Sequence, residues 1–356
     1  MTALPDLIGH DELRRRLTQQ ARAGSLPASL LFHGPAGVGK QQLALWLAKG
    51  LVCPEASAPC GACQHCRLAS QWQHPDIQWV FPRPRLKDGD ASPEDVRGDL
   101  AEAIADRAKA LGLYPAPAGT EGIFVATVRA VVQGVASAPA LAKRRVVIIG
   151  DAERMVPQEG ADQAANAFLK VLEEPPVGTT IILTSSEPGA LLPTIRSRVV
   201  AMRVAPLPER LVRQFLDRAG VRPALKAAGL PADDDQLVAY AGGAPGALLA
   251  GAARAAAAAE AQRILEAAAG PASARFKTAF QQGASGARGA FTDVLDALTD
   301  VLADRVRRDA DRAPARAAAA ARAVLDVEGA KASARQNAQP SLLMARLLPT
   351  LAEAGR

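Results

Sequence analysis

Short apolar runs alternate with helix-spaced segments over about the first 205 residues of the chain. Each run has the length and the apolar character of a buried strand, and each segment between has the apolar spacing of a helix. The strand-like runs are 30–33, 77–81, 146–149, 180–184 and 199–204, and the helical patterns include 41–51, 124–134 and 161–173. This alternation predicts a parallel sheet that helices cover on both faces.

Residues 83–120 interrupt the alternation. The stretch is rich in proline, glycine and charge, and its one helical pattern covers Glu94–Leu111. We therefore expect a mobile insertion on the sheet domain. Arg83, Arg85 and Lys87 could contact nucleic acid there, although a charged stretch of this kind is more often a solvated loop.

The strand pattern stops at Pro206, and the rest of the chain is predicted to be helical. Residues 207–255 form a small helical domain in this interpretation, with a helix boundary at the Gly-Gly-Ala-Pro-Gly segment 242–246. From 256 onward the pattern is all helical and includes one apolar stripe, which could be buried within the chain or pack against partner helices. The stripe consists of Phe291, Val294, Leu295, Leu298, Leu302 and Val306.

Composition and charge narrow the picture only slightly. The net charge is +6 and the pI is about 9.4, which is compatible with DNA contact and equally with a solvated basic surface. No run of 18 apolar residues is present, and the N-terminal sequence has no apolar core of a signal peptide. We therefore expect no membrane span and a cytoplasmic location.

A glycine-rich loop of the phosphate-binding type follows the first predicted strand. Gly34, Gly39 and Lys40 match the pattern G-x-x-x-x-G-K-[ST], whose backbone N–H groups face a phosphate. The last position should supply a hydroxyl ligand for Mg²⁺, but it is Gln41. The loop predicts a nucleotide-hydrolysing fold that lacks part of the hydrolytic machinery, so ATP and Mg²⁺ binding are in doubt.

All four cysteines of the chain lie close together, at Cys53, Cys60, Cys63 and Cys66. The spacing C-x6-C-x2-C-x2-C suits a structural zinc site, whereas a disulfide framework does not suit a large cytoplasmic protein. His65 and His74 are spare candidates, but four thiolates already complete the shell of the metal. We expect zinc in a structural role.

Several segments together resemble the clamp-loader branch of the AAA+ ATPases. They are LIGHDELRRRL at 7–17, LLFHGPAGVGK at 30–40, the four-cysteine segment, HPD at 74–76, NAFLKVLEEPP at 166–176, TIRSRV at 194–199 and NAQPSLLMARLL at 337–348. The resemblance covers essentially the whole chain except 83–120. It implies an α/β P-loop domain over 1–205 with a zinc module at 53–66, a helical lid over 206–255 and an all-α collar for oligomerisation over 256–356.

Four departures from the motor subunits of that family point to a non-motor subunit. Gln41 is the first. Asp151 is followed by Ala152, where a motor subunit carries the glutamate that orients water, and Glu153 comes one residue later. Gly246 replaces an arginine for the γ-phosphate, and no long tail follows the collar. These losses predict no appreciable ATP turnover. Any passive nucleotide binding would use Gly34, Gly37, Gly39, Lys40, Gln41 and Asp151.

One active element is retained according to the resemblance. Arg198 corresponds to an arginine finger that acts in trans on the ATP of a neighbouring subunit. Val199 stands where the family has cysteine, Arg196 could share the role, and a surface ion pair is the plain alternative for Arg198.

The function implied is that of a non-motor subunit of the replicative clamp loader in DNA replication. Its expected partners are motor subunits of the gamma/tau type, the delta subunit, the sliding clamp and primed DNA. One alternative is an ATP-hydrolysing motor subunit of the same loader, against which Gln41, Ala152 and Gly246 argue. The other is a stand-alone P-loop enzyme such as a kinase, against which LEEPP and the helical third region argue.

Overall fold

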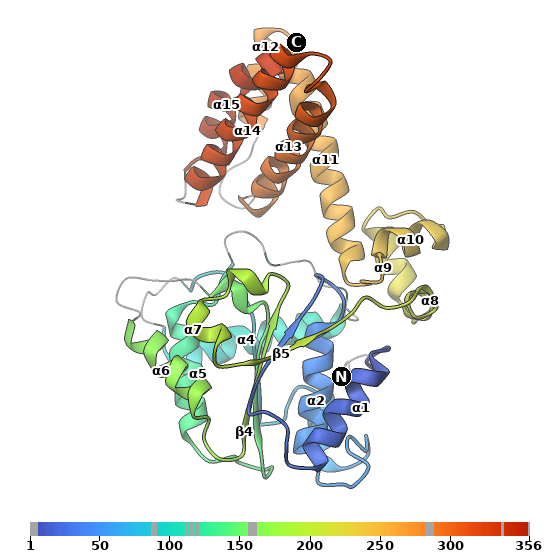
Figure 1. Cartoon of the computed structure of the whole chain (residues 1–356), viewed down its shortest axis with the longest axis vertical. Helices are drawn as coiled ribbons and strands as arrows, with labels where there is room; N and C mark the ends of the chain where they lie inside the picture. Colours follow the sequence, from blue (N-terminus) through green and yellow to red (C-terminus); the bar gives the residue numbers. More distant parts are fainter. Residues whose placement is uncertain are drawn as a thin grey trace. The chain divides into compact units, whose positions relative to one another are not determined.

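The computed structural model describes residues 6–86, 91–110, 113, 117, 121–155, 162–281, 288–335 and 338–354. It divides the chain into two compact units (Figure 1), and each is described by itself. The first comprises residues 1–116 and 121–249, and the second comprises residues 117–120 and 250–356. The predicted lid region therefore falls almost wholly within the first unit.

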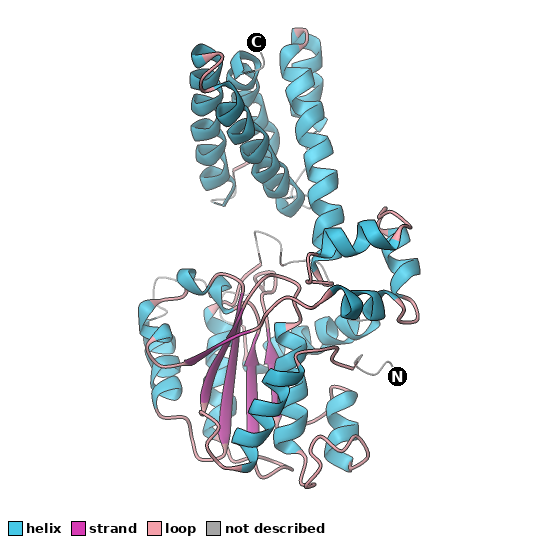
Figure 2. Cartoon of the chain, turned by 45° about the vertical axis from the view of Figure 1, so that its right-hand side comes forward, coloured by secondary structure: helices cyan, strands magenta, loops and turns pink. Residues whose placement is uncertain are grey.

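A five-stranded parallel sheet is the centre of the first unit (Figure 2). The strands are β1 Ser29–His33, β2 Ile77–Val80, β3 Arg145–Ile149, β4 Thr179–Ser185 and β5 Val200–Arg203, in the spatial order β2-β3-β4-β1-β5. Leu31 of β1 pairs with Leu183 of β4 on one side and with Ala201 of β5 on the other. All five predicted strands are present, and the prediction of a parallel sheet is confirmed.

Helices cover both faces of the sheet, because its central strands are apolar on both faces. Figure 1 shows α5 and α6 on one side of the sheet and α1 and α2 on the other. The helices associated with the sheet are α1 Asp11–Arg22, α2 Lys40–Val52, α3 Gln64–Ser70, α4 Pro93–Lys109, α5 Val125–Ala136, α6 Asp162–Glu173 and α7 Pro193–Arg196. Two short 3₁₀ helices, Ala152–Arg154 and Pro188–Ala190, follow β3 and β4.

The segment expected as a mobile insertion contributes α4 to the core. Ser92 and Asp95 form a reciprocal capping box at its start, with Pro93 in the first turn. Its apolar face is buried in the same core as the sheet, through Val96, Leu100 and Ala103. The expectation of an appended insertion is therefore wrong for this helix, because its helical apolar spacing outweighs the Pro- and Gly-rich flanks. Lys87 lies outside the described residues.

Three short helices with a hydrophobic core of their own follow β5. They are α8 Glu209–Leu216, α9 Val221–Ala227 and α10 Asp234–Ala241. Val212, Leu216 and Val221 are fully buried in this core. Asp233 caps the start of α10 through the N–H groups of Asp235 and Gln236, and Gly242 ends it in the left-handed region at φ 51°.

The regular elements among the described residues of the second unit are all helices. Its elements are α11 Ala247–Ala269, α12 Ala272–Gln281, α13 Arg288–Asp309, α14 Pro314–Arg335 and α15 Pro340–Ala354, of which α11 begins in the first unit. The apolar stripe of α13 is buried against α14 and α15, with Leu295, Leu298 and Leu302 fully covered. The question left open by the sequence is thereby answered: this stripe is buried within the chain. Among the described helices of both units, none is long and apolar enough to cross a membrane.

Candidate functional site

The glycine-rich loop lies where the sequence predicts it, between the end of β1 at His33 and the start of α2 at Lys40. Gly37 takes the left-handed conformation, at φ 78°, that the loop needs to turn toward the helix. The ammonium of Lys40 does not extend into solvent, because the residue is only 5% exposed. Burial lowers the pKa of Lys40, and the nearby carboxylates of Asp151 and Glu153 oppose that change.

All three donors of the Lys40 ammonium have partners within the chain. Nζ donates to the carbonyl oxygens of Gly34 at 2.9 Å and Pro35 at 2.8 Å, and to Oγ of Ser186 at 2.9 Å. An ammonium has three N–H donors, so none is left for a phosphate without breaking one of these bonds. In this conformation Lys40 stabilises its own loop.

Gln41 is hydrogen-bonded at both ends of its amide. Nε2 donates to Oδ2 of Asp151 at 2.9 Å. Oε1 accepts from Nε1 of Trp79 at 3.1 Å and from Nη1 of Arg107 at 3.0 Å. An amide oxygen has two acceptor sites, and both are used. The oxygen of the side chain at the position of the Mg²⁺-binding hydroxyl is therefore saturated by protein groups, and one N–H of its amide nitrogen is bonded to Asp151.

Arg107, which belongs to α4, places a permanent positive charge next to the amide of Gln41. Its guanidinium carbon lies 3.5 Å from the ring centre of Phe81 and 5.2 Å from that of Trp79, which is cation–π geometry. Burial and the neighbouring Glu153 raise the pKa of Asp151, while Arg107 and Lys40 work in the opposite direction. A cation covalently attached to the chain thus lies near the carboxylate that would otherwise help to hold a metal ion.

Glu153 is engaged with the backbone next to Lys40. Its Oε1 accepts the N–H of Ser186 at 2.9 Å, and the hydroxyl of Ser186 in turn accepts from Lys40. The N–H of Asp151 itself is bonded to Oγ1 of Thr184 at 3.1 Å. The acidic residues after β3 therefore fix the ends of β3 and β4 around the loop.

The backbone of the segment after α10 touches the glycine-rich loop directly. The N–H of Gly246 donates to the carbonyl of Gly37 at 2.9 Å. A Cβ added to Gly246 would lie 2.9 Å from Cα of Gly37, and one added to Gly37 would lie 2.2 Å from the nitrogen of Ala247. Both positions require glycine, because these two segments of the chain approach each other too closely for a side chain.

Arg198 lies apart from this cluster and is paired with its own chain. Nη1 donates to the carbonyl of Thr194 at 2.9 Å, and Nη2 donates to Oε1 of Glu173 at 3.3 Å. Its side chain is 28% exposed and that of Glu173 57%. Arg196, the other arginine that the sequence offers for the finger role, is exposed at the end of α7. The structure brings Arg198 together with α6 and α7.

The four cysteine sulfurs form a compact cluster in which all lie within 4.8 Å of one another. Sγ of Cys53 is 3.8 Å from Sγ of Cys63, and Sγ of Cys60 is 3.9 Å from Sγ of Cys66. A tetrahedron of sulfurs around zinc, with Zn–S of about 2.3 Å, has edges of about 3.8 Å. All four cysteines are free of disulfides, so the donor set fits a structural zinc ion.

Backbone N–H groups support the thiolate form at the start of this module. The N–H of Cys63 donates to Sγ of Cys60 at 3.3 Å, and the N–H of Cys66 donates to Sγ of Cys63 at 3.4 Å. The N–H groups of Cys63 and Ala62 lower the pKa of Cys60 to about 7, whereas burial raises the pKa of Cys63 and raises that of Cys66 to about 12. Thiolate is the form that binds a metal.

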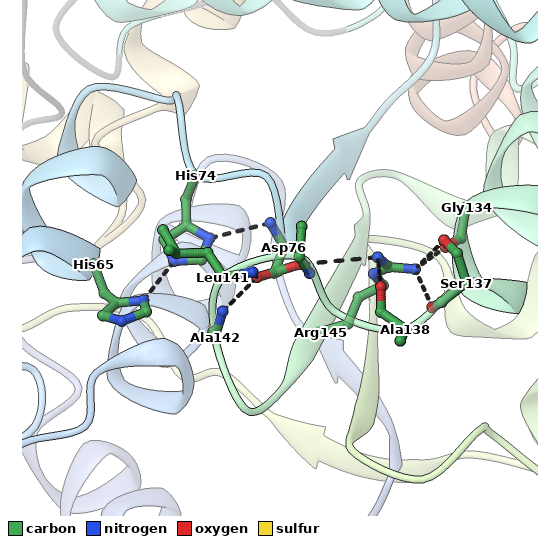
Figure 3. Close-up of polar contacts among 10 residues, drawn as sticks. His65, His74, Asp76, Gly134, Ser137, Ala138, Leu141, Ala142 and Arg145 are labelled. Carbon is green, nitrogen blue, oxygen red and sulfur yellow. Dashed lines mark hydrogen bonds and ion pairs between the residues drawn. The ribbon is translucent and has the colours of Figure 1, made fainter.

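The two spare histidines bond to each other (Figure 3). Nδ1 of His65 lies 2.9 Å from Nε2 of His74, and Nδ1 of His74 accepts the N–H of Asp76 at 3.1 Å. If His74 is neutral, as the burial that lowers its pKa favours, its proton lies on Nε2 and is donated to His65. The two rings are thereby used in linking α3 to the start of β2.

Asp76 continues this chain of contacts into the sheet (Figure 3). Its buried carboxylate accepts the N–H groups of Ala140 at 2.5 Å, Leu141 at 2.8 Å and Ala142 at 2.6 Å, and lies 3.8 Å from Arg145. Burial opposes the charge of Asp76, but the three N–H donors hold its pKa below the usual value. The HPD motif therefore joins the cysteine module to the loop before β3.

Sequence reasoning missed Arg107 and Ser186. Ser186 follows β4 directly. Because side chains that follow parallel strands gather at one edge of the sheet, its place in the sequence could have indicated that it lies near the loop. Arg107 carried no such signal, because it belongs to the segment interpreted as an insertion. Its role depends on where α4 packs.

Taken together, the parallel sheet and the glycine-rich loop between β1 and α2 define a P-loop-type protein, in which Gln41, directly after Lys40, is hydrogen-bonded to Asp151. A family model described as DNA polymerase III, delta subunit, matches residues 9–208, which is more than half of the chain. The chain belongs to this family.

Similar proteins include the DNA polymerase III subunit delta′ of Pseudomonas aeruginosa, which is 34% identical over 180 residues, covering 50% of this chain and 43% of that protein. Subunit delta′ of Escherichia coli K12 is 29% identical over 205 residues, covering 57% and 50%. Subunit tau of Salmonella typhimurium is 27% identical over 214 residues, covering 60% and 27%. The chain spans about half the length of the two delta′ relatives.

Proposed function

We propose that this chain is a non-motor subunit of the replicative clamp loader, of the delta′ type, that helps to load the sliding clamp onto primed DNA. Its partners in this proposal are gamma/tau-type motor subunits, the delta subunit, the sliding clamp and primed DNA. Helices α8–α10 serve as the lid, and α11–α15 provide the collar through which subunits assemble. Membership of the delta subunit family and the delta′ relatives support this proposal.

One observation carries the non-motor assignment: Gln41, Asp151 and Arg107 are bonded into one cluster. Hydrolysis of ATP needs Mg²⁺ between the β- and γ-phosphates, held by a hydroxyl and an acidic side chain. Here an amide replaces the hydroxyl, and the guanidinium bonded to that amide acts electrostatically on the acid, Asp151. Coulomb repulsion between that guanidinium and a divalent cation disfavours metal binding at this place.

Arg198 is proposed to act in trans on the nucleotide of a neighbouring motor subunit. Its partners in this chain are the exposed Glu173, which it contacts through Nε and Nη2, the carbonyl of Thr194 and the hydroxyl of Ser197. Exposed ion pairs contribute only about 0–1 kcal/mol. A guanidinium held this weakly can exchange Glu173 for a phosphate, which it binds in fork geometry.

The cysteine cluster is proposed to hold a structural zinc ion. When bound, the ion supplies a closed tetrahedral crosslink and no open position for chemistry. The residues that would hold it are Cys53, Cys60, Cys63 and Cys66. The distances between their sulfur atoms support the assignment.

A motor subunit of the same loader is the second candidate, favoured by the intact Gly34, Gly39 and Lys40 and by the similarity to subunit tau. One experiment separates the two. The purified chain is assayed for Mg²⁺-dependent ATP hydrolysis alone and then within a loader reconstituted with motor and delta subunits and the clamp. A non-motor subunit shows no turnover alone, and the complete loader depends on its presence. Turnover by the pure chain that Lys40→Ala abolishes would identify a motor.

A further inference from the structure

A cavity of about 430 Å³ lies beside α2, away from the glycine-rich loop. Its walls come from the segment before α1, from α1, α2 and α3, from Pro59 and Gly61 of the cysteine-containing loop, from the α3–β2 connection, from β2 and from Ile104 of α4. None of its lining residues belongs to the loop 34–40. On α2 the lining residues are Gln42, Leu45, Trp46 and Lys49, which lie on one face of the helix at the spacing i, i+3, i+4, i+7. Small-molecule sites typically have about 300–1,000 Å³, so the cavity has the size of a ligand site.

All three tryptophans of the chain line this cavity. Trp72 and Trp79 are stacked, with ring centres 4.6 Å apart and planes inclined by 16°. Trp46 lies on α2 beneath the guanidinium of Arg14, at 4.9 Å. Aromatic faces of this kind bind planar rings by stacking. Trp72 also has a backbone φ of 61°, a conformation that is an outlier for a bulky residue and is found preferentially at functional sites.

Two buried N–H donors in the lining have no partner among the described residues, Nε1 of Trp72 and Nε of Arg14. Buried donors are nearly always satisfied, and an unsatisfied one costs stability unless a ligand or water completes it. Lys49 adds further donors, because only one of its N–H groups is used, on Oγ of Ser70 at 2.6 Å.

The charge of the lining is positive. Arg14 and Lys49 are its two cations, and Asp6, which is exposed, is its one acid. Arg14 is ion-paired through Nη1 with Asp11, whose side chain is 70% exposed. An anionic group entering the cavity would meet the unpaired Nε of Arg14 and the ammonium of Lys49 beside aromatic surface, which is the combination that recognises a phosphorylated or carboxylated ring.

We propose that this cavity binds a planar aromatic anion of about the size of a nucleoside monophosphate. The ring lies against the tryptophan faces, and the anionic group is held by Arg14 and Lys49. The N–H of Trp72 donates to an acceptor on the ligand. This site is separate from the glycine-rich loop, so binding here does not use Lys40 and does not require the chain to be a motor or a non-motor subunit.

Tryptophan fluorescence of the full-length chain tests the proposal, because every tryptophan reports on the cavity. AMP is the probe, and adenosine and ribose 5-phosphate are its two halves. We expect AMP to change the emission saturably and each half to bind at least tenfold more weakly. Trp72→Phe, which keeps an aromatic face but removes the donor, and Arg14→Gln should each raise the dissociation constant for AMP at least tenfold.

Two matched variants complete the test. Arg16→Gln changes an exposed arginine on the same helix, and Lys40→Ala disables the glycine-rich loop; both should leave AMP affinity unchanged. Lys49→Gln provides a third cavity variant if either of the others fails to fold, as judged by far-ultraviolet circular dichroism. The proposal is overturned if AMP gives no saturable change in the wild-type chain, or if Lys40→Ala abolishes the change while the cavity variants retain it.

Discussion

Gly246 donates its backbone N–H to the carbonyl oxygen of Gly37 across 2.9 Å, so the segment after α10 lies directly on the tip of the glycine-rich loop. Motor subunits of the clamp-loader family carry an arginine at the position of Gly246 by the resemblance described above. In this chain an arginine there would begin with a Cβ 2.9 Å from Cα of Gly37. The missing arginine and the close contact are therefore two aspects of one arrangement.

The first prediction concerns this contact. Gly246→Arg should destabilise the first unit by about 1–3 kcal/mol, because the new side chain forces the two backbones apart. On the proposed function it should not create ATP hydrolysis, since Gln41 stays bonded to Asp151 and Arg107. Thermal unfolding and an ATPase assay measure both. Gly329→Arg is the matched control, because a Cβ there meets nothing within 4 Å, and its unfolding temperature should stay near that of the wild type.

The second prediction concerns the side-chain amide of Gln41. Gln41→Ala leaves Nε1 of Trp79 without its acceptor and removes the one hydrogen bond that links Gln41 to Asp151. We expect a loss of about 1–3 kcal/mol in the free energy of unfolding, the cost of unsatisfied buried polar groups. Denaturant titration measures it. The neighbouring Gln42→Ala, which is partly exposed, should cost far less, and equal losses for both variants would contradict the argument.

The third prediction concerns the cysteine cluster. Freshly purified, reduced protein should contain one zinc ion per chain, and Cys66→Ser should lose it, as measured by elemental analysis. Acid should also release the metal, because protons compete for the thiolates. His65→Ala should retain it, since His65 is bonded to His74 and is not needed as a ligand. The assignment would be contradicted if elemental analysis found no zinc in the freshly purified, reduced wild-type protein.

The fourth prediction is a dependence on pH. The pKa of Asp76 in the folded chain lies below its ordinary value of 3.8, so its contribution to stability is full above that value and fades as the pH falls through the folded pKa. Asp76→Asn should cost about 1–3 kcal/mol at neutral pH, because an amide presents donors to three N–H groups. The difference from the wild type should shrink in strong acid. Exposed Asp311→Asn should show no difference at any pH.

The fifth prediction concerns Arg198. Arg198→Ala should leave the unfolding temperature nearly unchanged, because it removes only a surface ion pair. In a reconstituted loader it should nevertheless lower ATP hydrolysis and clamp loading, since a finger contributes about 10³–10⁵ in rate at the site it serves. Arg196→Ala is the control and should act like the wild type. A loader with Arg198→Ala that retains the wild-type rate would refute the finger.

The strands could be predicted from sequence because their signal is local. Three of the five strands, β1, β3 and β4, contain short runs of Val, Ile or Leu in a buried parallel sheet, and nothing but their own residues is needed to recognise them. The same holds for the cysteine cluster, whose spacing alone restricts the sulfurs to one small volume. The strand–loop–helix order around Lys40 follows from these local signals as well.

The contacts that decide the chemistry could not be predicted in this way. Arg107 reaches Gln41 from 66 positions away in the sequence, and this depends on how α4 packs. The sequence around Gly246 predicts only a helix boundary. Glycine is required at this position because Gly37 lies so close to it. The stripe on α13 was ambiguous because an apolar helix face has the same spacing whether its own chain or a partner covers it.

Arg107 has one further consequence. A metal ion arrives with each nucleotide and leaves again with the product, so the electrostatic field of an ordinary P-loop site changes through the catalytic cycle. The guanidinium of Arg107 is part of the chain and remains charged at every physiological pH. The positive charge bonded to Gln41 is therefore present in every state of the chain. If the chain works in a clamp loader as proposed, this charge is the same before and after each round of hydrolysis at a neighbouring subunit.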